Sequence, residues 1–324
     1  MKKSAILLTG CAGFIGSSLT HYFLNQKKIV IGLDNLKLGN LKNLNRSIKE
    51  KNFFFKKLDI SNFAELSHYI IKITKKYKIE TIWHLAANSD IKDGFNDPDN
   101  DYKNTFLTTY NLIKISKKIK VKNFVFASSS AIYGDLKNKK ISEDSGPLLP
   151  ISVYGAMKLA SEGIISAAKE SFLKKIYIFR FPNVVGYPST HGVIHDFIKK
   201  LKKNPFKLDV LGNGQQKKIY MHVNDLINSM NYVVKNSTKN ISLFNLGPRD
   251  NGVTVKFISK EVIKYFNKNK KIIFQKKTKG WVGDVPIFRY STKKFKKFAP
   301  KIKTYSRNAI IKAVKELISN GKLS

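Results

Sequence analysis

Three residues near the middle of the chain could together move a proton: a serine, a tyrosine and a lysine. Residues 121–135 read VKNFVFASSSAIYGD, an apolar run that ends in three serines, and Tyr154 and Lys158 follow further along the chain. Side chains at positions i and i+4 lie on one face of a helix, so the lysine ammonium can stand beside the tyrosine phenol. A hydroxyl from the serine-rich strand end can share a proton that passes to or from a substrate oxygen. This set predicts acid–base chemistry at a hydroxyl or carbonyl group.

The phenol of Tyr154 needs help to act as a base near neutral pH. A tyrosine ordinarily has a pKa of about 10 and is protonated at pH 7. An adjacent ammonium, together with a second positive charge in the site, would favour the phenoxide and lower that pKa. Because Tyr-x-x-x-Lys also occurs by chance on many helices, the surrounding sequence decides what it means.

A glycine-rich stretch near the start of the chain supplies that context. Residues 4–16 read SAILLTGCAGFIG, which predicts a strand, a tight turn and a helix. Gly10 permits the turn, Gly13 lets a diphosphate approach the backbone, and Gly16 lets the helix pack close to the strand. A second apolar run, 29–33, ends in Asp34, whose carboxylate can bind ribose hydroxyls and would repel a 2′-phosphate. The stretch predicts a dinucleotide site that favours NAD over NADP; a plain glycine turn beside a surface aspartate is the alternative.

Alternating strand-like and helix-like segments must position these residues. We expect strands at 4–9, 28–33, 52–57, 80–85, 122–128 and 175–181, and helices at 14–25, 62–77, 99–119 and 152–172. Such alternation predicts a doubly wound parallel sheet, the α/β Rossmann class, over residues 1–181. Residues 182–324 contain shorter pieces, with helices near 192–202, 223–235, 255–267 and 306–319. These predict a second, smaller mixed α/β domain that binds substrate and is interleaved with the first.

The charge of the chain invites a nucleic-acid interpretation that its composition does not favour. The formal net charge of the 324 residues is +38, but only five of the 60 basic residues are arginine, and the lysines are spread along the whole chain. Arginine is the preferred partner of phosphates and base edges. We therefore expect solvated lysine faces and no specific nucleic-acid partner.

Other compositional features narrow the class of protein. Cys11 is the only cysteine, and it lies in the glycine-rich stretch, so no internal disulfide can form. The histidines are scattered without the spacing of metal ligands, which predicts no metal site. His84, at a strand end, is expected to be a hydrogen-bonded support. No apolar run is long enough to span a bilayer, and we expect a cytoplasmic protein that does not bind membranes.

These motifs together resemble the extended short-chain dehydrogenase/reductases. Within them the chain is most similar to the nucleotide-sugar 4-epimerases that act on UDP-glucose and UDP-galactose, and the resemblance covers nearly its whole length. It rests on TGCAGFIG, Asp34-Asn35-Leu36, Gly39-Asn40-Leu41, Leu58-Asp59-Ile60, His84-Leu85-Ala86-Ala87, Asn104, ASSSAIYG, YGAMK, Arg180-Phe181-Pro182-Asn183 and HGVIHDFI.

The resemblance implies roles for individual residues. Ser129, Tyr154 and Lys158 would be catalytic, with Tyr154 and Lys158 also binding the cofactor and Lys158 holding the nicotinamide ribose. The remaining NAD-binding positions would be Gly10, Gly13, Phe14, Ile15, Gly16, Asp34, Asn35, Gly39, Asn40, Asp59, Ile60, Leu85, Ala86, Ala87, Asn104 and Phe181. Substrate would contact Ser129, Asn183, Val193, Ile194, Leu208, Leu211 and Lys218. Val193, Ile194, Leu208 and Leu211 are equally suited to a hydrophobic core.

Differences from the family pattern help to choose the reaction. In the related 4,6-dehydratases an acidic pair follows the catalytic hydroxyl, whereas here Ser130 and Ala131 follow Ser129, which disfavours dehydration. Lys218 stands where the family often has an arginine, and Trp281 replaces a second one, so the grip on the substrate diphosphate is in question. Arg249, Lys279 or Arg289 could compensate.

The sequence thus predicts an NAD-dependent epimerase that inverts C4 of a nucleotide-diphosphate sugar through a 4-keto intermediate. Two alternatives stay open: a decarboxylase, another epimerase or a reductase of the same superfamily, and an NAD-sensing or nucleic-acid-binding protein on the same fold. The family usually dimerises through two helices, here 99–119 and 152–172, so a homodimer is expected.

Overall fold

The computed structural model describes residues 2–91, 93–136, 140–204, 206–266, 270–276 and 290–320. The chain forms two compact units. The first contains Met1–Gly134, Gly146–Arg180 and Met230–Phe244, and the second contains Asp135–Ser145, Phe181–Ser229 and Asn245–Ser324. Each unit is therefore assembled from separate stretches of sequence, with a boundary at residues 180–181 and shorter exchanges on either side of it.

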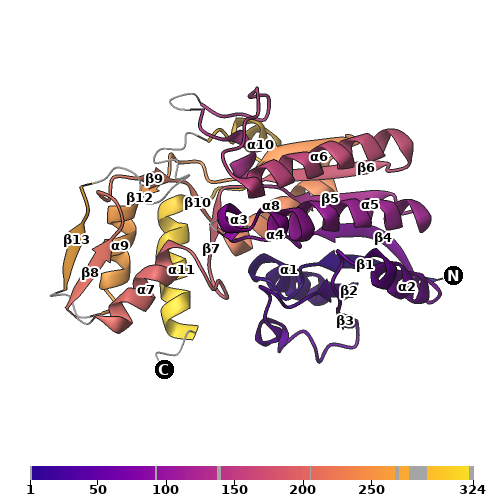
Figure 1. Cartoon of the computed structure of the whole chain (residues 1–324), viewed down its shortest axis with the longest axis horizontal. Helices are drawn as coiled ribbons and strands as arrows, with labels where there is room; N and C mark the ends of the chain where they lie inside the picture. The colour runs from indigo at the N-terminus through magenta and orange to yellow at the C-terminus, as the bar shows by residue number, and fades with distance from the viewer. Residues whose placement is uncertain are drawn as a thin grey trace. The chain divides into compact units, whose positions relative to one another are not determined.

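A seven-stranded sheet forms the centre of the first unit (Figure 1). Its order is β11-β6-β5-β4-β1-β2-β3, and the neighbouring pairs from β6 to β3 run parallel. The strands are β1 (Lys3–Thr9), β2 (Ile29–Asp34), β3 (Phe53–Lys57), β4 (Tyr77–His84), β5 (Asn123–Ala127), β6 (Lys175–Arg180) and β11 (Ile241–Asn245). The predicted doubly wound α/β class is confirmed.

Helices cover this sheet and bury their apolar faces against its strands. They are α1 (Phe14–Asn25), α2 (Phe63–Thr74), α3 (Asp93–Asn96), α4 (Pro98–Asp101), α5 (Thr108–Lys118) and α6 (Val153–Ser171), with short 3₁₀ turns η1 (Leu41–Leu44) and η3 (Ser130–Tyr133). Figure 1 shows α5 and α6 side by side along the sheet. Leu112 on α5 and Ile165 on α6 are fully buried and belong to the same apolar cluster as Leu7 of β1 and Phe124 of β5.

The helix expected at 99–119 is not continuous. A π-helical segment, η2 (Tyr102–Leu107), separates α4 from α5. Pro98 stands at the start of α4, where the missing amide of proline costs nothing. A π segment adds a residue per turn and shifts the side chains that follow it, and such segments often mark functional positions.

The second unit is built from shorter elements around its own apolar core. They are β7 (Asn183–Val185), α7 (Val193–Lys203), β8 (Lys207–Val210), β9 (Lys217–Lys218), β10 (Tyr220–His222), α8 (Val223–Asn236), β12 (Val253–Thr254), α9 (Val255–Ile263), β13 (Lys271–Phe274), α10 (Lys293–Phe298) and α11 (Ser306–Asn320). The strands pair as β10-β7, β12-β9 and β13-β8. Phe197 of α7, Ile258 of α9 and Ile310 of α11 meet in one buried cluster.

Helix α8 starts in the second unit and ends in the first. It leads the chain into β11, which joins the edge of the large sheet beside β6. Across the described parts of the chain, no helix has both the length and the apolar character needed to cross a membrane.

Candidate active site

The glycine loop joins β1 to α1 through backbone contacts. Gly10 has a φ of 69°, and its amide donates to the Leu33 carbonyl at 2.8 Å. A Cβ at Gly16 would lie 1.9 Å from the Gly10 oxygen, and a Cβ at Gly10 would lie 2.7 Å from the Ala86 nitrogen. Any side chain at these two positions would therefore push α1 or the segment after β4 away from the loop.

The start of α1 is left without a side-chain cap. Gly13 is the N-cap residue and offers no side-chain acceptor, and the first turn holds no acidic residue. The first amides of a helix have no intrahelical partner and carry partial positive charge. The amides of Phe14, Ile15 and Gly16 are thus suited to receive an anionic group such as a diphosphate.

Asp34 lies beside this loop, at the end of β2. Its Oδ2 accepts the Ala12 amide at 2.9 Å, and its Oδ1 accepts the Leu36 amide at 2.8 Å. Burial raises the pKa of this carboxyl group, while the backbone donors lower it. A carboxylate has about four acceptor positions, so it can accept ribose hydroxyls in addition. A Cβ at Gly39 would lie 2.7 Å from Oδ1, which explains a glycine at that position.

A surface pocket of ≈ 380 Å³ opens next to Asp34. It is lined by Asn35, Lys37, Lys57, Leu58, Asp59 and Glu65. Ile60 is buried, and its carbonyl accepts from the Asn111 side chain at 3.1 Å. Asn40 supports the glycine loop, because its backbone amide donates to the Ala12 carbonyl at 3.1 Å. The pocket and Asp34 together fit the adenosine end of a dinucleotide.

Leu85, Ala86 and Ala87 follow β4 and are half-buried. The Leu85 amide donates to the Thr9 carbonyl at 3.2 Å, which holds the segment against the glycine loop. His84 is fully buried, and its ring nitrogens lie 2.8 Å and 2.9 Å from the hydroxyls of Thr9 and Thr109. Both nitrogens are engaged, so His84 is a support between β1, β4 and α5.

The structure brings Ser129 and Tyr154 together. Ser129 caps the η3 turn, its Oγ accepts the Ala131 amide at 3.1 Å, and it hydrogen-bonds the Tyr154 phenol. The first turn of α6 lies close to η3, because a Cβ at Gly155 would be 2.6 Å from the Ala131 oxygen. Ser152 caps α6 by accepting the Gly155 amide at 3.1 Å. The glycine after the tyrosine is thus what lets the phenol reach the serine.

Lys158 lies one turn further along α6 and is almost completely buried, with 2% exposure. Its Nζ donates to the Ala127 carbonyl at 2.7 Å and lies 5.8 Å from the centre of the Tyr154 ring. The ring of Phe126 is 4.6 Å from the same nitrogen. The three predicted catalytic residues therefore converge at the end of β5.

Burial dominates the acid–base properties of this group. It raises the pKa of Tyr154 to about 12, against the effect of the Ser129 hydrogen bond, and Asp101 adds to the rise. It lowers the pKa of Lys158 to about 7, opposed by Glu162 and Asp101. The sequence predicts a lowered pKa for Tyr154, with a second positive charge supplied by a bound nicotinamide. In the chain alone the pKa is raised instead. The chain alone keeps the phenol protonated at neutral pH.

Charged residues that the sequence analysis did not single out lie directly behind Lys158. Glu162 and Arg180 form a buried ion pair at 2.7 Å, and Ser128 hydrogen-bonds the same carboxylate. Asp101 is also buried, and among the described residues its Oδ2 has no hydrogen-bond partner. The i+4 spacing of Glu162 from Lys158 was a usable signal, but its pairing with Arg180 depends on the fold.

Asn104 lies on the π segment η2. Its side chain donates to the Asn100 carbonyl at 3.0 Å, and it is half-buried. The neighbouring Thr105 is buried instead, and its hydroxyl accepts the Asn88 amide at 3.1 Å. Asn104 therefore stays a predicted cofactor contact, while Thr105 is the residue that η2 turns inward.

The predicted substrate residues fall on different kinds of position in the second unit. Asn183 is exposed at the start of β7, Val193 is half-buried at the start of α7, and Leu211 is exposed after β8. Ile194 and Leu208 are buried in the apolar core of this unit. The core placement is the alternative foreseen for these two, and their contact with a nucleoside stays a prediction.

Lys218, Phe181 and Arg249 complete the predictions in the second unit. Lys218 pairs with Val253 across β9 and β12, and Phe181 is half-buried before β7. The Arg249 guanidinium donates to the carbonyls of Ile302, at 3.1 Å, and Pro300. These contacts make it a brace for the backbone. Lys279, Trp281 and Arg289 lie outside the described residues.

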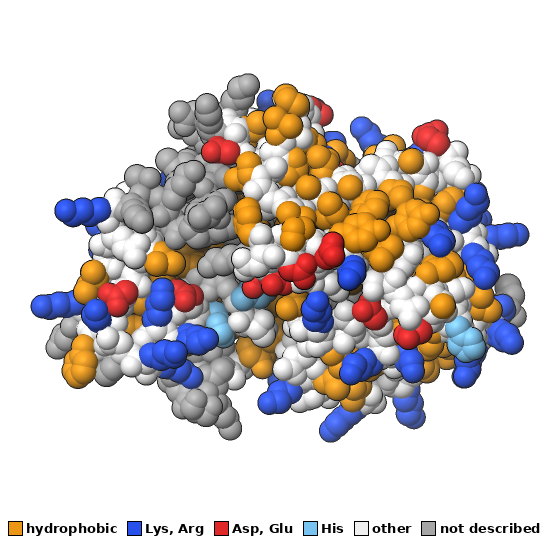
Figure 2. Space-filling view, in the orientation of Figure 1, with side chains coloured by type: hydrophobic (Ala, Val, Ile, Leu, Met, Phe, Trp, Pro, Cys, Tyr) orange, Lys and Arg blue, Asp and Glu red, His pale blue; other side chains and the backbone are white. Residues whose placement is uncertain are grey.

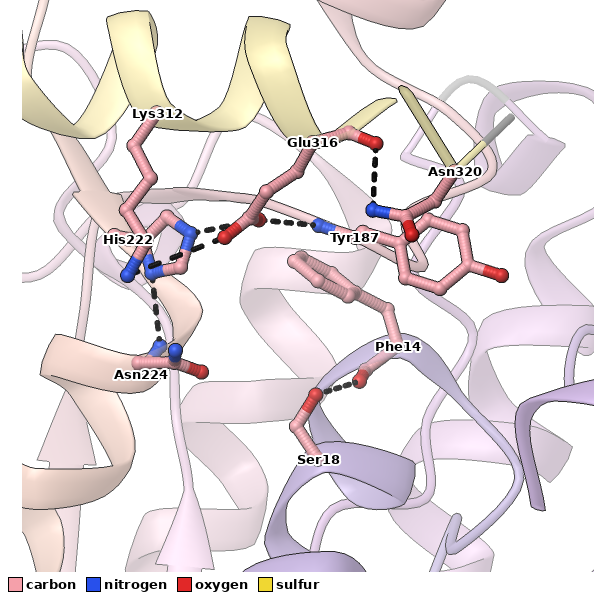
Figure 3. A network of polar contacts seen from close by, with 8 residues as sticks. All are labelled: Phe14, Ser18, Tyr187, His222, Asn224, Lys312, Glu316 and Asn320. Atoms are coloured by element: carbon pink, nitrogen blue, oxygen red, sulfur yellow. Dashed lines mark hydrogen bonds and ion pairs between the residues drawn. The ribbon is translucent and has the colours of Figure 1, made fainter. Parts of the chain in front are cut away.

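A polar network in the second unit connects α11 to the strands β7 and β10 (Figure 3). His222 Nδ1 accepts the Asn224 amide at 3.2 Å, which leaves the ring proton on Nε2, 2.9 Å from Glu316 Oε2. The same oxygen accepts the Tyr187 amide at 3.2 Å. Glu316 therefore anchors the turn that follows β7, the strand that begins with Asn183.

Among the described residues, the basic side chains that give the chain its net charge of +38 lie at the surface, except the buried Lys158 and Arg180. In Figure 2 the Lys and Arg side chains are distributed over the visible face rather than gathered in one stripe. Within the ranges that the structure describes, no group of three or more His, Cys, Asp or Glu residues is arranged to hold a metal ion.

Comparison with known families decides how this arrangement is classified. The model of the NAD dependent epimerase/dehydratase family matches residues 6–247. The chain belongs to this family. The match includes the glycine loop, Asp34, and the Ser129, Tyr154 and Lys158 set.

Individual relatives show how wide the family is. A protein of Bacillus subtilis (strain 168) described as the uncharacterized UDP-glucose epimerase YtcB is 32% identical over 266 residues, which is 78% of this chain and 80% of that protein. The dTDP-D-glucose 4,6-dehydratase of Dictyostelium discoideum is 32% identical over 248 residues, 71% of this chain. The chain spans 55% of the length of that dehydratase.

A solved structure with a similar fold carries both kinds of ligand. The UDP-glucuronic acid 4-epimerase of Bacillus cereus, in complex with UDP-glucuronic acid and NAD, superimposes with a TM-score of 0.82. It is 25% identical, and the match covers 98% of this chain and 99% of that one. Epimerases and dehydratases thus both appear among the proteins to which this family member is similar.

Proposed function

We propose that this chain is an NAD-dependent nucleotide-sugar 4-epimerase of the UDP-glucose/UDP-galactose type. The observation that carries the proposal is the convergence of Ser129, Tyr154 and Lys158 at the end of β5, next to a turn without a carboxylate at positions 130 and 131. Family membership and the similarity to a UDP-glucose epimerase support the same reaction class.

The glycine loop and Asp34 fit the cofactor. The uncapped amides of Phe14, Ile15 and Gly16 would hold the diphosphate, and Asp34 would bind the adenosine ribose. Lys158 would hold the nicotinamide ribose. When bound, NAD would accept a hydride from C4 of the sugar and return it later.

The protein residues would manage the proton that accompanies this hydride. The Tyr154 phenolic oxygen would take the proton from the 4-hydroxyl, with the Ser129 hydroxyl sharing it, and return it after the keto group has turned its other face. Because burial holds the pKa of Tyr154 at about 12 in the chain alone, the phenoxide needs positive charge from Lys158 and from the oxidised nicotinamide. The site would therefore be active only when oxidised NAD is bound.

Dehydration is the reaction that the local residues support least. Eliminating water would need an acid and a base beside the catalytic hydroxyl, and Ser130 and Ala131 provide neither. Of the buried acids, Glu162 is occupied by Arg180. Asp101 accepts from the Asn88 side chain through Oδ1 at 3.0 Å, so only its Oδ2 is without a partner among the described residues. Besides the hydride acceptor, epimerisation requires only a proton carrier, the role proposed for Tyr154.

Supplying each sugar separately tests the proposal. UDP-glucose and UDP-galactose should each give the same equilibrium mixture, without accumulation of NADH. If neither these sugars nor their N-acetyl forms interconvert, the proposal is wrong. Release of carbon dioxide from a UDP-uronic acid, or steady formation of NADH, would identify the decarboxylase or reductase alternative. Salt-dependent DNA binding without turnover would identify the nucleic-acid alternative.

A homodimer through α5 and α6 belongs to the same proposal. Tyr102 on η2 and Tyr110 on α5 are exposed, with 45% and 41% of their surface accessible, and would be covered by a partner. Sedimentation of the protein as a dimer is expected, and a monomer at all concentrations would contradict it.

A further inference from the structure

Four side chains form a buried polar network behind the Tyr154–Lys158 pair. Arg180 donates from Nε to Glu162 Oε1 at 3.0 Å and from Nη2 to Oε2 at 2.7 Å, and its Nη1 donates to the Tyr133 hydroxyl at 2.9 Å. Ser128 donates to Glu162 Oε1. All four residues are buried, with 6% or less of each residue exposed. The Glu162 carboxylate thus receives donors from two neighbouring strands, β5 and β6.

A buried charged network contributes little to the free energy of folding, because removing the charges from water costs about as much as their attraction returns. A buried ion pair seldom stabilises a fold more than well-packed apolar residues of similar volume would. The position of the charges therefore matters more than their contribution to stability. This network lies where β5 ends and the catalytic turn begins.

Glu162 connects the helix that carries Lys158 to the strand end that carries Ser129. It lies four residues after Lys158 on α6, so the two side chains share one face of the helix. Lys158 donates to the carbonyl of Ala127, and the next residue, Ser128, donates to Glu162. The residue after that is Ser129. One carboxylate thus ties the lysine-bearing helix to the strand end that carries the serine.

We propose that Glu162 is a positioning residue that keeps Lys158 charged inside the protein and fixes the strand end that presents Ser129. This inference rests on the proposed function, because it assigns the network a role in that reaction. Arg180 holds the carboxylate in place through two parallel hydrogen bonds.

Burial and the neighbouring charges have opposite effects on the pKa of Lys158. Its burial lowers the pKa of the ammonium to about 7, and the negative charges of Glu162 on α6 and Asp101 on α4 raise it. On β4, the charge of Lys158 and burial together lower the pKa of His84, which stays neutral. Tyr154, on the same helix face, is neutral as well. Arg180 on β6 is the remaining cation, but the charges that act on the pKa of Lys158 are those of Glu162 and Asp101. Removing the Glu162 charge should therefore deprotonate Lys158 at lower pH.

Lysine titration in the cofactor-free protein tests this directly. The chain is labelled with ε-¹³C-lysine, and the Lys158 resonance is identified by its absence from the Lys158→Met variant. In Glu162→Gln the titration midpoint of Lys158 should fall by about one pH unit relative to the unmodified chain. Glu170→Gln is the matched control, because Glu170 is an exposed glutamate on the same helix. Its midpoint should not move. An unchanged midpoint in Glu162→Gln would overturn the inference.

Two further variants separate positioning from folding. If Glu162→Gln alone does not fold, Glu162→Gln with Arg180→Met removes both charges, and a lower midpoint is still expected. Ser128→Ala keeps the carboxylate but breaks its link to β5. It should lower kcat severalfold and leave the Lys158 midpoint unchanged. Unaltered kcat in Ser128→Ala would contradict the strand-end role.

Failure of this inference is distinguishable from failure of the proposed function. The midpoint is measured without cofactor or sugar, so it reports on Glu162 whatever the reaction is. Absence of NADH binding and of sugar turnover in the unmodified chain would reject the function. Normal turnover with an unmoved Lys158 midpoint in Glu162→Gln would reject only the role of Glu162.

Discussion

The glycine loop and the proposed proton-transfer group of the first unit are built in different ways. The loop is made of backbone, where Gly10 and Gly16 allow close contacts and Gly13 leaves the start of α1 without a side-chain cap. The proton-transfer group is made of side chains, with Tyr154 and Lys158 buried on α6 over the end of β5. The loop depends on space that is left empty, and the second region depends on charges placed inside the protein.

This difference determines how each region fails. Adding atoms to the loop forces the backbone apart, so the damage is to packing and to cofactor binding together. Changing a side chain in the proton-transfer group alters charge and pKa while the backbone can stay in place. Four substitutions sharpen this contrast, and the first should have the largest effect.

Replacing Tyr154 with Phe removes the proposed proton carrier and keeps the ring. Epimerisation should fall about a thousandfold or more, because general acid–base catalysis contributes on that order. NAD should remain bound, since the loop and Asp34 are unchanged. Turnover assays and mass spectrometry of the bound cofactor check both points. Full activity in this variant would show that another residue carries the proton.

Replacing Gly16 with Ala places a Cβ 1.9 Å from the Gly10 oxygen. The free energy of unfolding should drop by roughly 3 kcal/mol, and cofactor binding should be lost with it, because strand and helix must separate. Urea unfolding and NADH fluorescence measure the two effects.

Gly163→Ala is the matched control for that change. A Cβ at Gly163, in the middle of α6, would meet nothing within 4 Å. This variant should gain about 0.5–1 kcal/mol, because alanine is the better helix former. Equal losses in both variants would contradict the packing argument for Gly16.

Replacing Lys158 with Met should stabilise the cofactor-free protein while abolishing turnover. The ordinary pKa of lysine, 10.5, applies to the unfolded chain, and burial lowers it to about 7 in the folded one. The folded state therefore binds fewer protons between pH 7 and pH 10.5, so this residue makes stability rise with pH across that window. The variant should be more stable by roughly 2 kcal/mol at pH 7 and lose that pH dependence. Urea unfolding at pH 7 and pH 9.5 measures it, and a less stable variant at pH 7 would contradict the account.

Replacing Asp34 with Asn should have the smallest effect. The new side chain keeps an oxygen acceptor for the backbone amide of Ala12 or Leu36 but lacks the negative charge that we propose binds the ribose hydroxyls. NAD affinity should weaken about tenfold, a loss typical of one charge-assisted hydrogen bond. Discrimination against NADP should decrease at the same time. Titration with both cofactors checks the prediction, and unchanged affinity for each would argue against a ribose contact.

Local sequence was enough for the glycine loop and the Tyr154–Lys158 pair. Gly10 and Gly16 are required by contacts between adjacent elements, and the i, i+4 relation needs only one helix. The network behind the pair was not predictable in this way, because Arg180 lies on β6 and meets Glu162 only after the sheet has formed. The same limit explains the split of the helix at 99–119, where the π segment η2 turns Thr105 inward.

Apolar positions were the hardest to interpret. Ile194 and Leu208 suit a nucleoside pocket and a core equally well, and the structure places both in the core of the second unit. Val193 and Leu211 are more accessible, yet they have the same apolar character in sequence. Periodicity shows that a side chain is apolar but not what it will touch.

The central claim is that one hydride leaves C4 of the sugar and returns to it within a single active site. Incubating the protein with UDP-glucose deuterated at C4, in ordinary water, tests this most directly. The account predicts that the UDP-galactose formed keeps its deuterium at C4, as measured by mass spectrometry. Loss of the deuterium to solvent, or a 6-deoxy-4-keto product, would contradict it.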